Sequence, residues 1–285
     1  MATPRTTPRA ALVTGCSSGI GRATALRLHR AGFVVYATGR RVDTLAELTH
    51  EGIVTLPLDV TDDASMRAAV ERVVADHGAV GVLVNNAGYE LVGPLEEVPM
   101  AEVRRQFETN VFGLIRLTQL ALPGMRAQGY GRVVNLSSIF GRFAVPGGAF
   151  YDASKHAVAG LSDALRLELA RFGIRVILVE STAARTGLNS NAVWASGVAD
   201  GPYAELRRRL DRWHADVWEE PPRNLAGRFA VSADDVARVI ERAVTARQPR
   251  ARYPVGVMAH GLFLLRRWLP DPAFHAFVRS QFPMP

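Results

Sequence analysis

Cysteine is nearly absent from this chain of 285 residues. Because Cys16 is the only one, no disulfide can form within the chain, and we expect a reducing, cytoplasmic location. No stretch approaches the roughly 18 apolar residues of a membrane-spanning helix, so we predict no stable membrane insertion. The opening residues MATPRTTPRA are polar and lack the apolar centre of a signal peptide, which predicts no secretion and a flexible terminus over residues 1–8.

Lysine is almost absent as well. Lys155 is the only lysine among 34 basic residues, which leaves 33 arginines. A net charge of +7 is compatible with nucleic acid or an anionic membrane as a partner. The arginines are scattered, however, in short clusters such as those at 40–41, 207–209 and 266–267. We therefore expect an arginine-rich soluble enzyme with no nucleic-acid partner.

The single lysine stands four residues after Tyr151, at the start of a predicted helix. Side chains at i and i+4 share one helix face, so the phenol and the ammonium can reach the same small volume. An ammonium beside a phenol favours the phenolate and is expected to lower the tyrosine pKa from about 10. Such a tyrosine can donate and accept protons. An ordinary amphipathic helix with a surface tyrosine also fits this pair, so the pair does not decide the function alone.

Apolar strands alternate with helices through the first 180 residues. Strands are predicted at 9–14, 33–38, 53–58, 80–85, 131–137 and 174–180, with helices at 22–31, 42–50, 62–77, 100–127 and from Tyr151 onward. Strands without polar alternation are typical of a parallel sheet that is buried on both faces. We therefore predict a single α/β domain over residues 1–285, a Rossmann-type doubly wound parallel sheet.

A glycine-rich turn at 15–21 (GCSSGIG) separates the first strand from the first helix. Glycines let the backbone come close to a ligand, and helix N-terminal amides bind a pyrophosphate. The spacing is GxxxGxG rather than GxGxxG, so the prediction of a dinucleotide site depends on the flanking strand and helix. Two arginines, Arg40 and Arg41, and no acid follow the second strand. An arginine suits the 2′-phosphate of NADP(H), although both also fit a solvated loop.

Residues 181–231 break the alternation and contain Trp194, Trp213 and Trp218. A long aromatic segment beyond the carboxyl end of a strand is typical of a substrate cover, although an incidental insertion also fits. A helix at 232–246 and a short strand near 253–256 follow. The apolar, arginine-edged segment at 260–280 fits a helix on the core, a subunit contact or a membrane-surface helix, and core or subunit packing is favoured.

Several motifs occur in one order along the chain: TGCSSGIG at 14–21, Asp59, NNAG at 85–88, Asn110, Ser138, Tyr151 and Lys155. In this order they resemble the short-chain dehydrogenase/reductase family over residues 9–186, and weakly over RYPVG at 252–256. The pattern is closest to members that act on steroids, retinoids or polyketide-like ketones.

The resemblance implies a role for each catalytic candidate. Tyr151 would donate a proton to a carbonyl oxygen, and Ser138 would hydrogen-bond the same oxygen. Lys155 would lower the tyrosine pKa and hold the nicotinamide ribose, while Asn110 would hold a water that links Lys155 to solvent. Ser137 is the rival of Ser138, and the family's thirteen-residue spacing to the tyrosine selects Ser138.

The resemblance also implies which residues contact NADP(H). They are Gly15, Ser17, Ser18, Gly19 and Ile20 at the phosphates, Arg40 at the 2′-phosphate, Asp59 and Val60 at the adenine, Asn86, Ala87 and Gly88 at the adenosine ribose, and Tyr151, Lys155 and Thr186 towards the nicotinamide. No metal is expected. Cys16 is expected to be a packed small side chain rather than a redox thiol.

Two positions depart from the family pattern. Ser181 and Thr182 replace the usual Pro-Gly after the sixth strand, so the reactive half of the cofactor is expected to sit differently. Glu90 stands where small or apolar residues are common. It faces either the substrate or the solvent, and the solvent is slightly favoured.

These observations predict an NADP(H)-dependent ketoreductase or alcohol dehydrogenase for a hydrophobic, cyclic substrate, with Tyr151 as general acid and base. The alternative is a non-redox member of the same fold, an epimerase, dehydratase or cyclase in a biosynthetic pathway, and the Ser181–Thr182 departure motivates it. A catalytically silent dinucleotide binder is a third hypothesis, which the intact catalytic set disfavours.

The resemblance finally implies a homodimer or homotetramer, built through the helices at 100–127 and 151–172. Both helices carry more apolar residues than one core-facing stripe requires, and a symmetric interface would bury the excess. These residues are Phe107, Val111, Leu114, Leu117, Leu120, Val158, Leu161, Leu165 and Leu169. The same residues also fit a large monomer core.

Overall fold

The computed structural model describes residues 10–185, 192–194, 201–219 and 221–282. The terminus predicted to be flexible, residues 1–8, lies outside the described residues, and so does Thr186.

Seven parallel strands form the central sheet, and each predicted strand is present within a few residues of its expected bounds. Their spatial order is β11 (Arg252–Val255), β7 (Ile174–Ser181), β6 (Gly131–Ser138), β4 (Val82–Asn85), β1 (Ala10–Val13), β2 (Val34–Gly39) and β3 (Val54–Pro57). The order reverses between β1 and β4, and ligands bind beyond the carboxyl ends of the strands at such a point. The doubly wound α/β prediction is confirmed.

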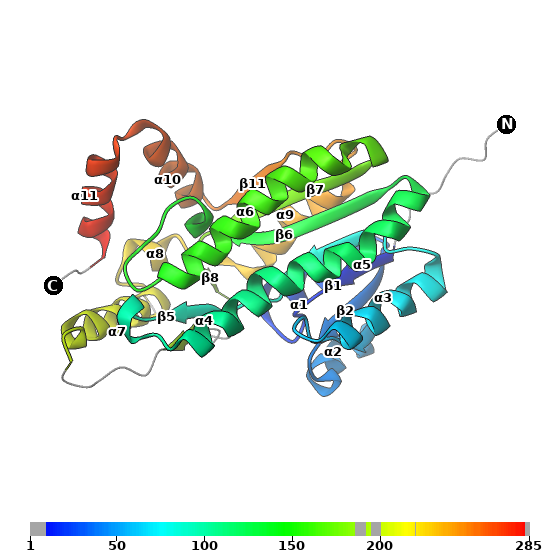
Figure 1. Cartoon of the computed structure of the whole chain (residues 1–285), viewed down its shortest axis with the longest axis horizontal. Coiled ribbons are helices and arrows are strands. Elements are labelled where there is room, and N and C mark those ends of the chain that lie inside the picture. Colours follow the sequence, from blue (N-terminus) through cyan, green and yellow to red (C-terminus); the bar gives the residue numbers. More distant parts are fainter. Residues whose placement is uncertain (1–9, 186–191, 195–200, 220, 283–285) are drawn as a thin grey trace.

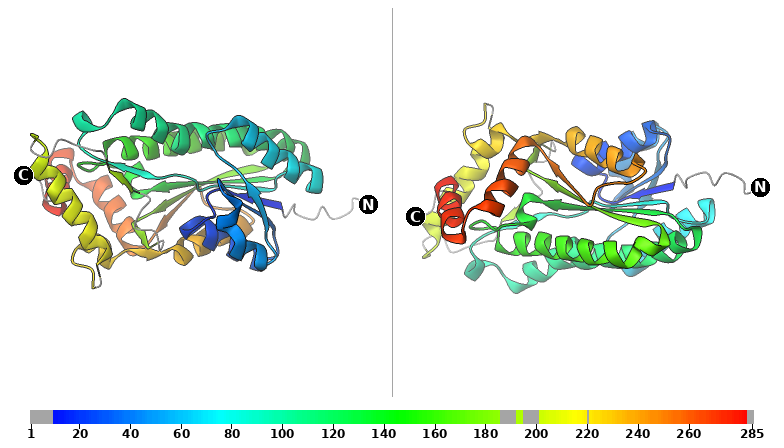
Figure 2. Two further views of the ribbon diagram at one scale, coloured as in Figure 1. Left: turned by 90° about the horizontal axis from the view of Figure 1, so that it is seen from below. Right: turned by 90° about the horizontal axis from the view of Figure 1, so that it is seen from above.

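Helices cover both faces of the sheet (Figure 2). One face is covered by α1 (Gly19–Arg30), η1 (Val42–Leu45), α2 (Ala46–His50) and α9 (Ala233–Thr245), and the other by α3 (Asp63–His77), α4 (Met100–Phe107), α5 (Gly113–Gln128), α6 (Ala149–Leu169) and η5 (Ala170–Phe172). The central strands β1, β4 and β6 are fully buried between these two layers, whereas the edge strands β3 and β11 are mostly half-buried. Burial on both faces is why the central strands show no polar alternation.

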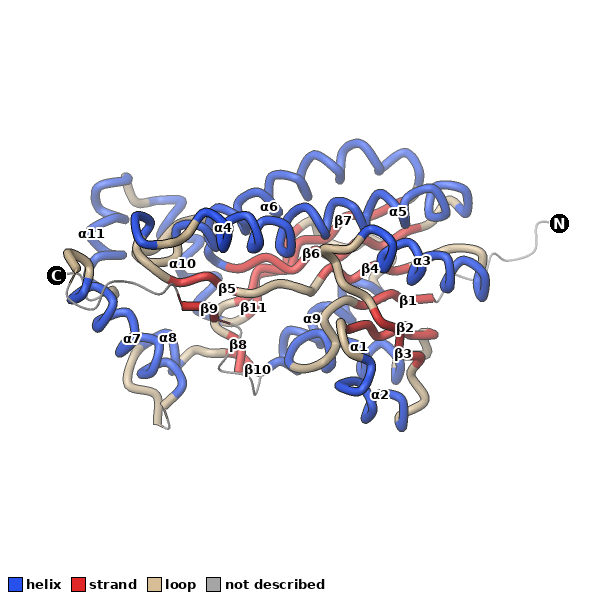
Figure 3. Tube along the Cα trace, turned by 60° about the horizontal axis from the view of Figure 1, so that its bottom comes forward, coloured by secondary structure: helices blue, strands red, loops and turns tan. Residues whose placement is uncertain are grey.

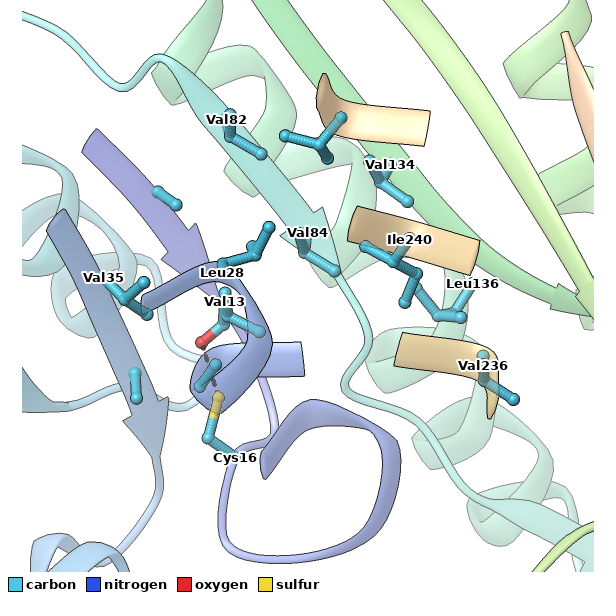
Figure 4. Close-up of a cluster of buried hydrophobic side chains, with 14 of the residues drawn as sticks. Val13, Cys16, Leu28, Val35, Val82, Val84, Val134, Leu136, Val236 and Ile240 are labelled. Atoms are coloured by element: carbon cyan, nitrogen blue, oxygen red, sulfur yellow. Dashed lines mark hydrogen bonds between the residues drawn. The ribbon is translucent and has the colours of Figure 1, made fainter. Parts of the chain in front are cut away.

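Figure 4 shows the core on the α1 side, where Val13, Val84 and Val134 from three strands meet Ile240 from α9. Cys16 belongs to this cluster, and its thiol donates a hydrogen bond to the Val13 carbonyl at 3.2 Å. Burial raises the pKa of the Cys16 thiol to about 12. A fully buried, protonated thiol is chemically inert, which confirms the expected packing role.

The predicted helix at 100–127 contains one turn of a different type. The stretch η3 (Glu108–Phe112) is a π-helix that joins α4 to α5 without a break in direction. Single π-turns inside α-helices are frequent at functional sites. Asn110 lies within this turn.

Further elements gather beyond the carboxyl ends of the strands, at the end of the molecule opposite the N-terminus (Figures 1 and 3). They are η2 (Leu95–Glu97), η4 (Ile139–Gly141), α7 (Ala204–Trp218), α8 (Leu225–Arg228), α10 (Val257–Trp268), α11 (Asp271–Gln281), and two small sheets that pair β5 (Glu90–Val92) with β9 (Ala192–Trp194) and β8 (Ala184–Arg185) with β10 (Val231–Ser232). The segment at 260–280 is therefore two helices.

The two C-terminal helices pack on the chain's own core. Phe274 and Val278 of α11 and Ala259 of α10 are buried against Phe143. The favoured prediction of core packing is thus correct for their inner faces. Among the described residues, no helix is long and apolar enough to cross a membrane.

Candidate active site

Helix α6 presents Tyr151 and Lys155 from consecutive turns, as the spacing predicts. The Lys155 side chain is 7% exposed, and its Nζ donates a hydrogen bond to the Leu136 carbonyl at 2.9 Å. Nζ lies 5.6 Å from the centre of the Tyr151 ring. The ammonium is therefore anchored on strand β6 beside the phenol.

Ser138 ends strand β6 and faces the phenol. Its Oγ accepts a hydrogen bond from the Phe140 amide at 3.2 Å, and it also hydrogen-bonds Tyr151, which favours the ionised phenol. The neighbouring Ser137 Oγ donates instead to the Lys155 carbonyl at 3.3 Å. The geometry thus distinguishes the two serines, and Ser138 is the one beside Tyr151.

The expected lowering of the Tyr151 pKa is wrong for this arrangement. Burial raises the pKa of Tyr151 well above its ordinary value, and the negative charge of Glu90 raises it further. Burial also lowers the pKa of Lys155 to about 8, against the opposing effect of Glu90. For both pKa values, the effect of burial outweighs the attraction between the Tyr151 phenolate and the Lys155 ammonium. The two side chains lie in a low-dielectric pocket, and the ammonium is directed at the Leu136 carbonyl.

Glu90 faces the cavity, so the slight preference for solvent is wrong. It opens strand β5 and lines the same cavity as Tyr151 and Lys155. Burial raises the pKa of Glu90 to about 7, while Lys155 pulls the pKa down. The site therefore contains an acid that the catalytic roles do not require.

Asn110 ties the π-turn to the segment that precedes Glu90. Its Oδ1 accepts from the Tyr89 amide at 3.1 Å, and its Nδ2 donates to the Tyr89 carbonyl at 2.9 Å and to Ser154 Oγ at 3.2 Å. The side chain thus positions residues 88–90 against α6. The water-holding role implied for Asn110 stays a prediction.

The glycine-rich turn leaves no room for side chains. A Cβ on Gly21 would come within 2.2 Å of the Gly15 carbonyl oxygen, and Gly15 itself has φ +71°. Asn86 holds the turn, because its Nδ2 donates to the carbonyls of Thr14 at 2.8 Å and Gly15 at 3.2 Å. Ser18 caps α1 without a side-chain hydrogen bond, so the first-turn amides remain available to an anion.

A single cavity of about 1950 Å³ joins this turn to the catalytic residues. Every predicted site residue that the structure describes lines it except Asn110: Gly15, Ser17, Ser18, Gly19, Ile20, Arg40, Asp59, Val60, Asn86, Ala87, Gly88, Ser138, Tyr151 and Lys155. Thr182 also lines it, and the buried Thr182 Oγ1 has no hydrogen-bond partner among the described residues. The glycine cradle and this unpartnered hydroxyl fit a dinucleotide along this wall.

The opposite half of the cavity is apolar and aromatic. It is lined by Phe140, Phe143, Trp194, Trp213, His214, Trp218, Val257, Met258, Leu262, Phe277 and Phe282. His214 packs edge-on against Trp194 and Trp213, and burial lowers the pKa of His214 to about 4. His214 itself is therefore uncharged at neutral pH, although charged residues of the same helix, Asp211, Arg212 and Asp216, also line the cavity.

The short chain dehydrogenase family model matches residues 9–195. The chain belongs to the short-chain dehydrogenase family. It is 35% identical to a 3-ketodihydrosphingosine reductase of Bacteroides thetaiotaomicron (93% of this chain, 94% of the relative). It is 33% identical to an NADPH-dependent 3-dehydrocapnine reductase of Ornithobacterium rhinotracheale (87% and 88%). A short-chain dehydrogenase from Streptomyces avermitilis superimposes with a TM-score of 0.79 at 33% identity, covering 97% of both chains.

Two polar groups of this short-chain dehydrogenase were missed by the sequence reasoning. Asp152 is 1% exposed, and burial raises the pKa of its carboxyl to about 8. An acid directly after Tyr151 in the first turn of α6 was the available signal. His214 carried no signal, because its contacts with the two tryptophans arise only once α7 folds over the cavity.

Proposed function

We propose that this short-chain dehydrogenase is an NADP(H)-dependent ketoreductase that interconverts a hydrophobic ketone and its secondary alcohol. The observation that carries the proposal is the convergence of Ser138, Tyr151 and Lys155 on one cavity, opposite an apolar wall and beside the glycine-rich turn. The family resemblance supports the catalytic roles of these three residues.

Tyr151 acts as the general acid. Because burial and Glu90 raise its pKa, the phenol stays protonated at neutral pH and can donate to a carbonyl oxygen. The Ser138 hydroxyl donates a hydrogen bond to the same oxygen and stabilises the negative charge that develops there. The nicotinamide, when bound, supplies the hydride.

Lys155 and Thr182 position the cofactor. The Lys155 ammonium uses one of its donors on Leu136, and others remain for the nicotinamide ribose. The Thr182 hydroxyl, which has no partner among the described residues, supplies a hydrogen bond at the carboxyl end of β7. This hydroxyl offers a polar contact where Pro-Gly would not.

The preference for NADP(H) rests on Arg40. The guanidinium lies at the end of β2, lines the cavity and forms no ion pair with the described residues, whereas Arg41 lies 3.9 Å from Asp43. The relative named as NADPH-dependent supports the same choice. Arg40→Ala should weaken NADPH binding about tenfold or more and leave NADH binding unchanged. Arg41→Ala is the matched control, and equal losses for both nucleotides would refute the 2′-phosphate contact.

The reaction is tested by following label from deuterated NADPH into the alcohol product of a hydrophobic ketone. We expect deuterium at the carbinol carbon and one NADPH consumed for each alcohol formed. Tyr151→Phe should retain NADPH binding and lose turnover by at least about a hundredfold. Product formation without label transfer or cofactor consumption would instead establish the epimerase, dehydratase or cyclase alternative.

A further inference from the structure

Among the described residues that line the cavity, Glu90 is the one acid whose charge changes the pKa of both Tyr151 and Lys155. It forms no hydrogen bond and no ion pair within the described part of the chain. Four other acids line the cavity, in different surroundings. Asp59 caps its own turn through Thr61, Glu219 pairs with Arg223 at 2.8 Å, and Asp211 and Asp216 lie on α7 in the cover segment. A carboxylate without a partner beside a reaction centre requires an explanation.

The backbone fixes the position of this carboxylate. The Asn110 side chain hydrogen-bonds both the backbone amide and the backbone carbonyl of Tyr89, the residue before Glu90. Directly after strand β5, the Gly93 amide donates to the Gly147 carbonyl at 2.9 Å. Glu90 itself pairs with Ala192 of β9. Strand β5 is thereby held between the π-turn, the loop that precedes α6 and the cover segment, so the carboxylate is part of a built site.

The alternation of β5 directs its side chains to two sides. Leu91 is 1% exposed and belongs to an apolar cluster with Val98 and Val103. Glu90 lies on the cavity side and lines the same cavity as Tyr151 and Lys155. Its charge raises the pKa of Tyr151 and opposes the lowering of the pKa of Lys155, so the acid lies near both groups.

We propose that Glu90 binds a positively charged ammonium group of the substrate, located near the carbonyl that Tyr151 protonates. The substrate class is then an apolar amino ketone and its amino alcohol, which deepens the proposed ketoreductase function and rests on it. A half-buried carboxylate without a partner gains most from a cation, because charge-assisted hydrogen bonds are roughly twice as strong as neutral ones. A hydroxyl group would satisfy the oxygen atoms but not the charge.

Lys155 does not fill this role. No ion pair within 4.0 Å joins Lys155 to Glu90 in the described chain, and the ammonium is already directed at Leu136. The groups that share an electrostatic interaction with Glu90 are Lys155, Tyr151 and Asp152 on α6. Helix α4, which also packs against β5, carries Glu102, Arg104 and Arg105, and Arg105 donates a hydrogen bond to Glu102 at 2.5 Å. The ligand cation approaches from the open cavity, where β9 contributes no charge.

The test measures binding of octylamine and octanol to the full-length protein loaded with NADP⁺, by calorimetry at about pH 8.5. Octylamine is a cation there, because alkyl ammonium groups titrate near the lysine value of about 10.4. We expect octylamine to bind about tenfold or more tightly than octanol. Glu90→Gln should remove this advantage and leave octanol binding unchanged. Glu219→Gln, in a cavity-lining acid that is already paired, is the matched control.

The pH dependence gives a second readout. Because the pKa of Glu90 lies near about 7, octylamine affinity should rise as the pH increases through that value, while octanol affinity stays constant. Equal affinities of the two ligands for the unchanged protein would overturn the proposal. So would a Glu90→Gln variant that loses octanol and octylamine binding alike, since that would indicate a change of pocket shape.

A kinetic comparison separates this proposal from the proposed reaction. The substrates are methyl hexyl ketone and its dimethylaminomethyl analogue, with NADPH. Glu90→Gln should lower kcat/KM about tenfold or more for the amino ketone only. Reduction of both ketones with no effect of Glu90→Gln would remove the cation site and leave the reaction standing. Glu90-dependent octylamine binding without reduction of either ketone would support the cation site and refute the proposed reaction.

Discussion

At the scale of single residues, Asp152 is the acid beside the site whose pKa is raised most. Its Oδ2 accepts a hydrogen bond from the Val145 amide at 2.8 Å, while the buried Oδ1 has no partner among the described residues. Burial raises the pKa of the carboxyl from 3.8 to about 8. The folded chain therefore holds a proton that the unfolded chain releases between these two pH values.

Stability should consequently fall as the pH rises from about 4 to about 8, because the unfolded state binds fewer protons there. Asp152→Asn removes this titration and supplies an amide that does not need to ionise. Its stability advantage over the unchanged protein should grow by on the order of 1–3 kcal/mol between about pH 5 and about pH 9. Glu90 shifts with the same sign and remains in both proteins.

Thermal unfolding at several pH values measures this difference. Asp211→Asn, at an exposed position of the cavity rim, serves as the control and should not change the pH profile. A variant whose profile runs parallel to that of the unchanged protein would show that Asp152 is ionised in the folded state at neutral pH.

Residue identities in the site could be predicted, but their protonation could not. Ser138, Tyr151 and Lys155 come together because i, i+4 geometry and the carboxyl end of a strand are local properties. The pKa of Tyr151 depends on how many groups from β5, β6 and α6 exclude water from it, which is decided by tertiary packing. The orientation of Glu90 depends on β5 pairing with β9, two short strands separated by about 100 residues.

At the scale of elements, Glu180 joins three segments around the site. Its fully buried carboxylate on β7 receives two hydrogen bonds from Arg142, at 2.7 and 2.8 Å, and one from Arg252 of β11 at 2.9 Å. Arg142 follows the short helix η4, which begins directly after Ser138. The Arg142 guanidinium also stacks over the ring of Phe263 of α10, with its Cζ 4.0 Å from the ring centre. This ion pair network thus holds the Ser138 loop against the edge of the sheet and the C-terminal helices.

Glu180→Gln should destabilise the fold by about 2–4 kcal/mol, because it leaves two arginines without their buried counter-charge. Both arginines are partly exposed, at 32% and 27% of their side chains, so water recovers part of the loss. Denaturant unfolding measures the change. Glu241→Gln, which breaks the more exposed pair with Arg27 at 3.1 Å, should cost less than about 1 kcal/mol. Equal losses in the two variants would show that burial of Glu180 adds nothing.

The long, regular elements follow from the sequence, whereas the irregular ones do not. Strands that are apolar throughout, such as 10–13 and 176–179, locate the sheet because both faces are buried. The π-turn around Asn110 leaves the apolar pattern of the helix unbroken, so periodicity does not detect it. Helices α10 and α11 are separated at Leu269–Pro270. The residue before a proline disfavours helical geometry, so Pro270 predicts this break, whereas the hydrophobicity of the segment does not.

At the scale of the whole molecule, the cover segment supplies much of the aromatic lining of the cavity. The cavity reaches from the glycine-rich turn to residues of α7, α10 and α11. These three helices lie at the end of the molecule opposite the N-terminus (Figure 1). The three tryptophans that the sequence places in the cover segment all line the cavity. Charged side chains line the reaction centre and the cofactor wall, and others from α7 and the turn after it, such as Asp211, Arg212 and Glu219, line the cover end as well.

Fewer residues are available for the predicted oligomer interface than the sequence indicated. Val111, Leu114, Leu117, Val158 and Leu169 are buried in the chain's own core, so they are not available to a partner. Phe112 and Leu167, however, are 51% and 81% exposed, on η3 and α6. Apolar residues at these positions remain candidates for a symmetric interface.

We predict that light scattering at micromolar concentration gives two or four times the chain mass of 31.0 kDa. Leu167→Asp should lower the mass to that of one chain without unfolding it, because the side chain makes little contact within the chain. Leu95→Asp, at a residue that is 65% exposed outside these helices, is the control and should leave the assembly intact. Because α6 also carries Tyr151 and Lys155, a partner packed on its outer face restrains the helix that positions the proton donor. Loss of assembly should therefore lower turnover more than NADPH affinity, whereas a fully active single chain would show that the site needs no partner.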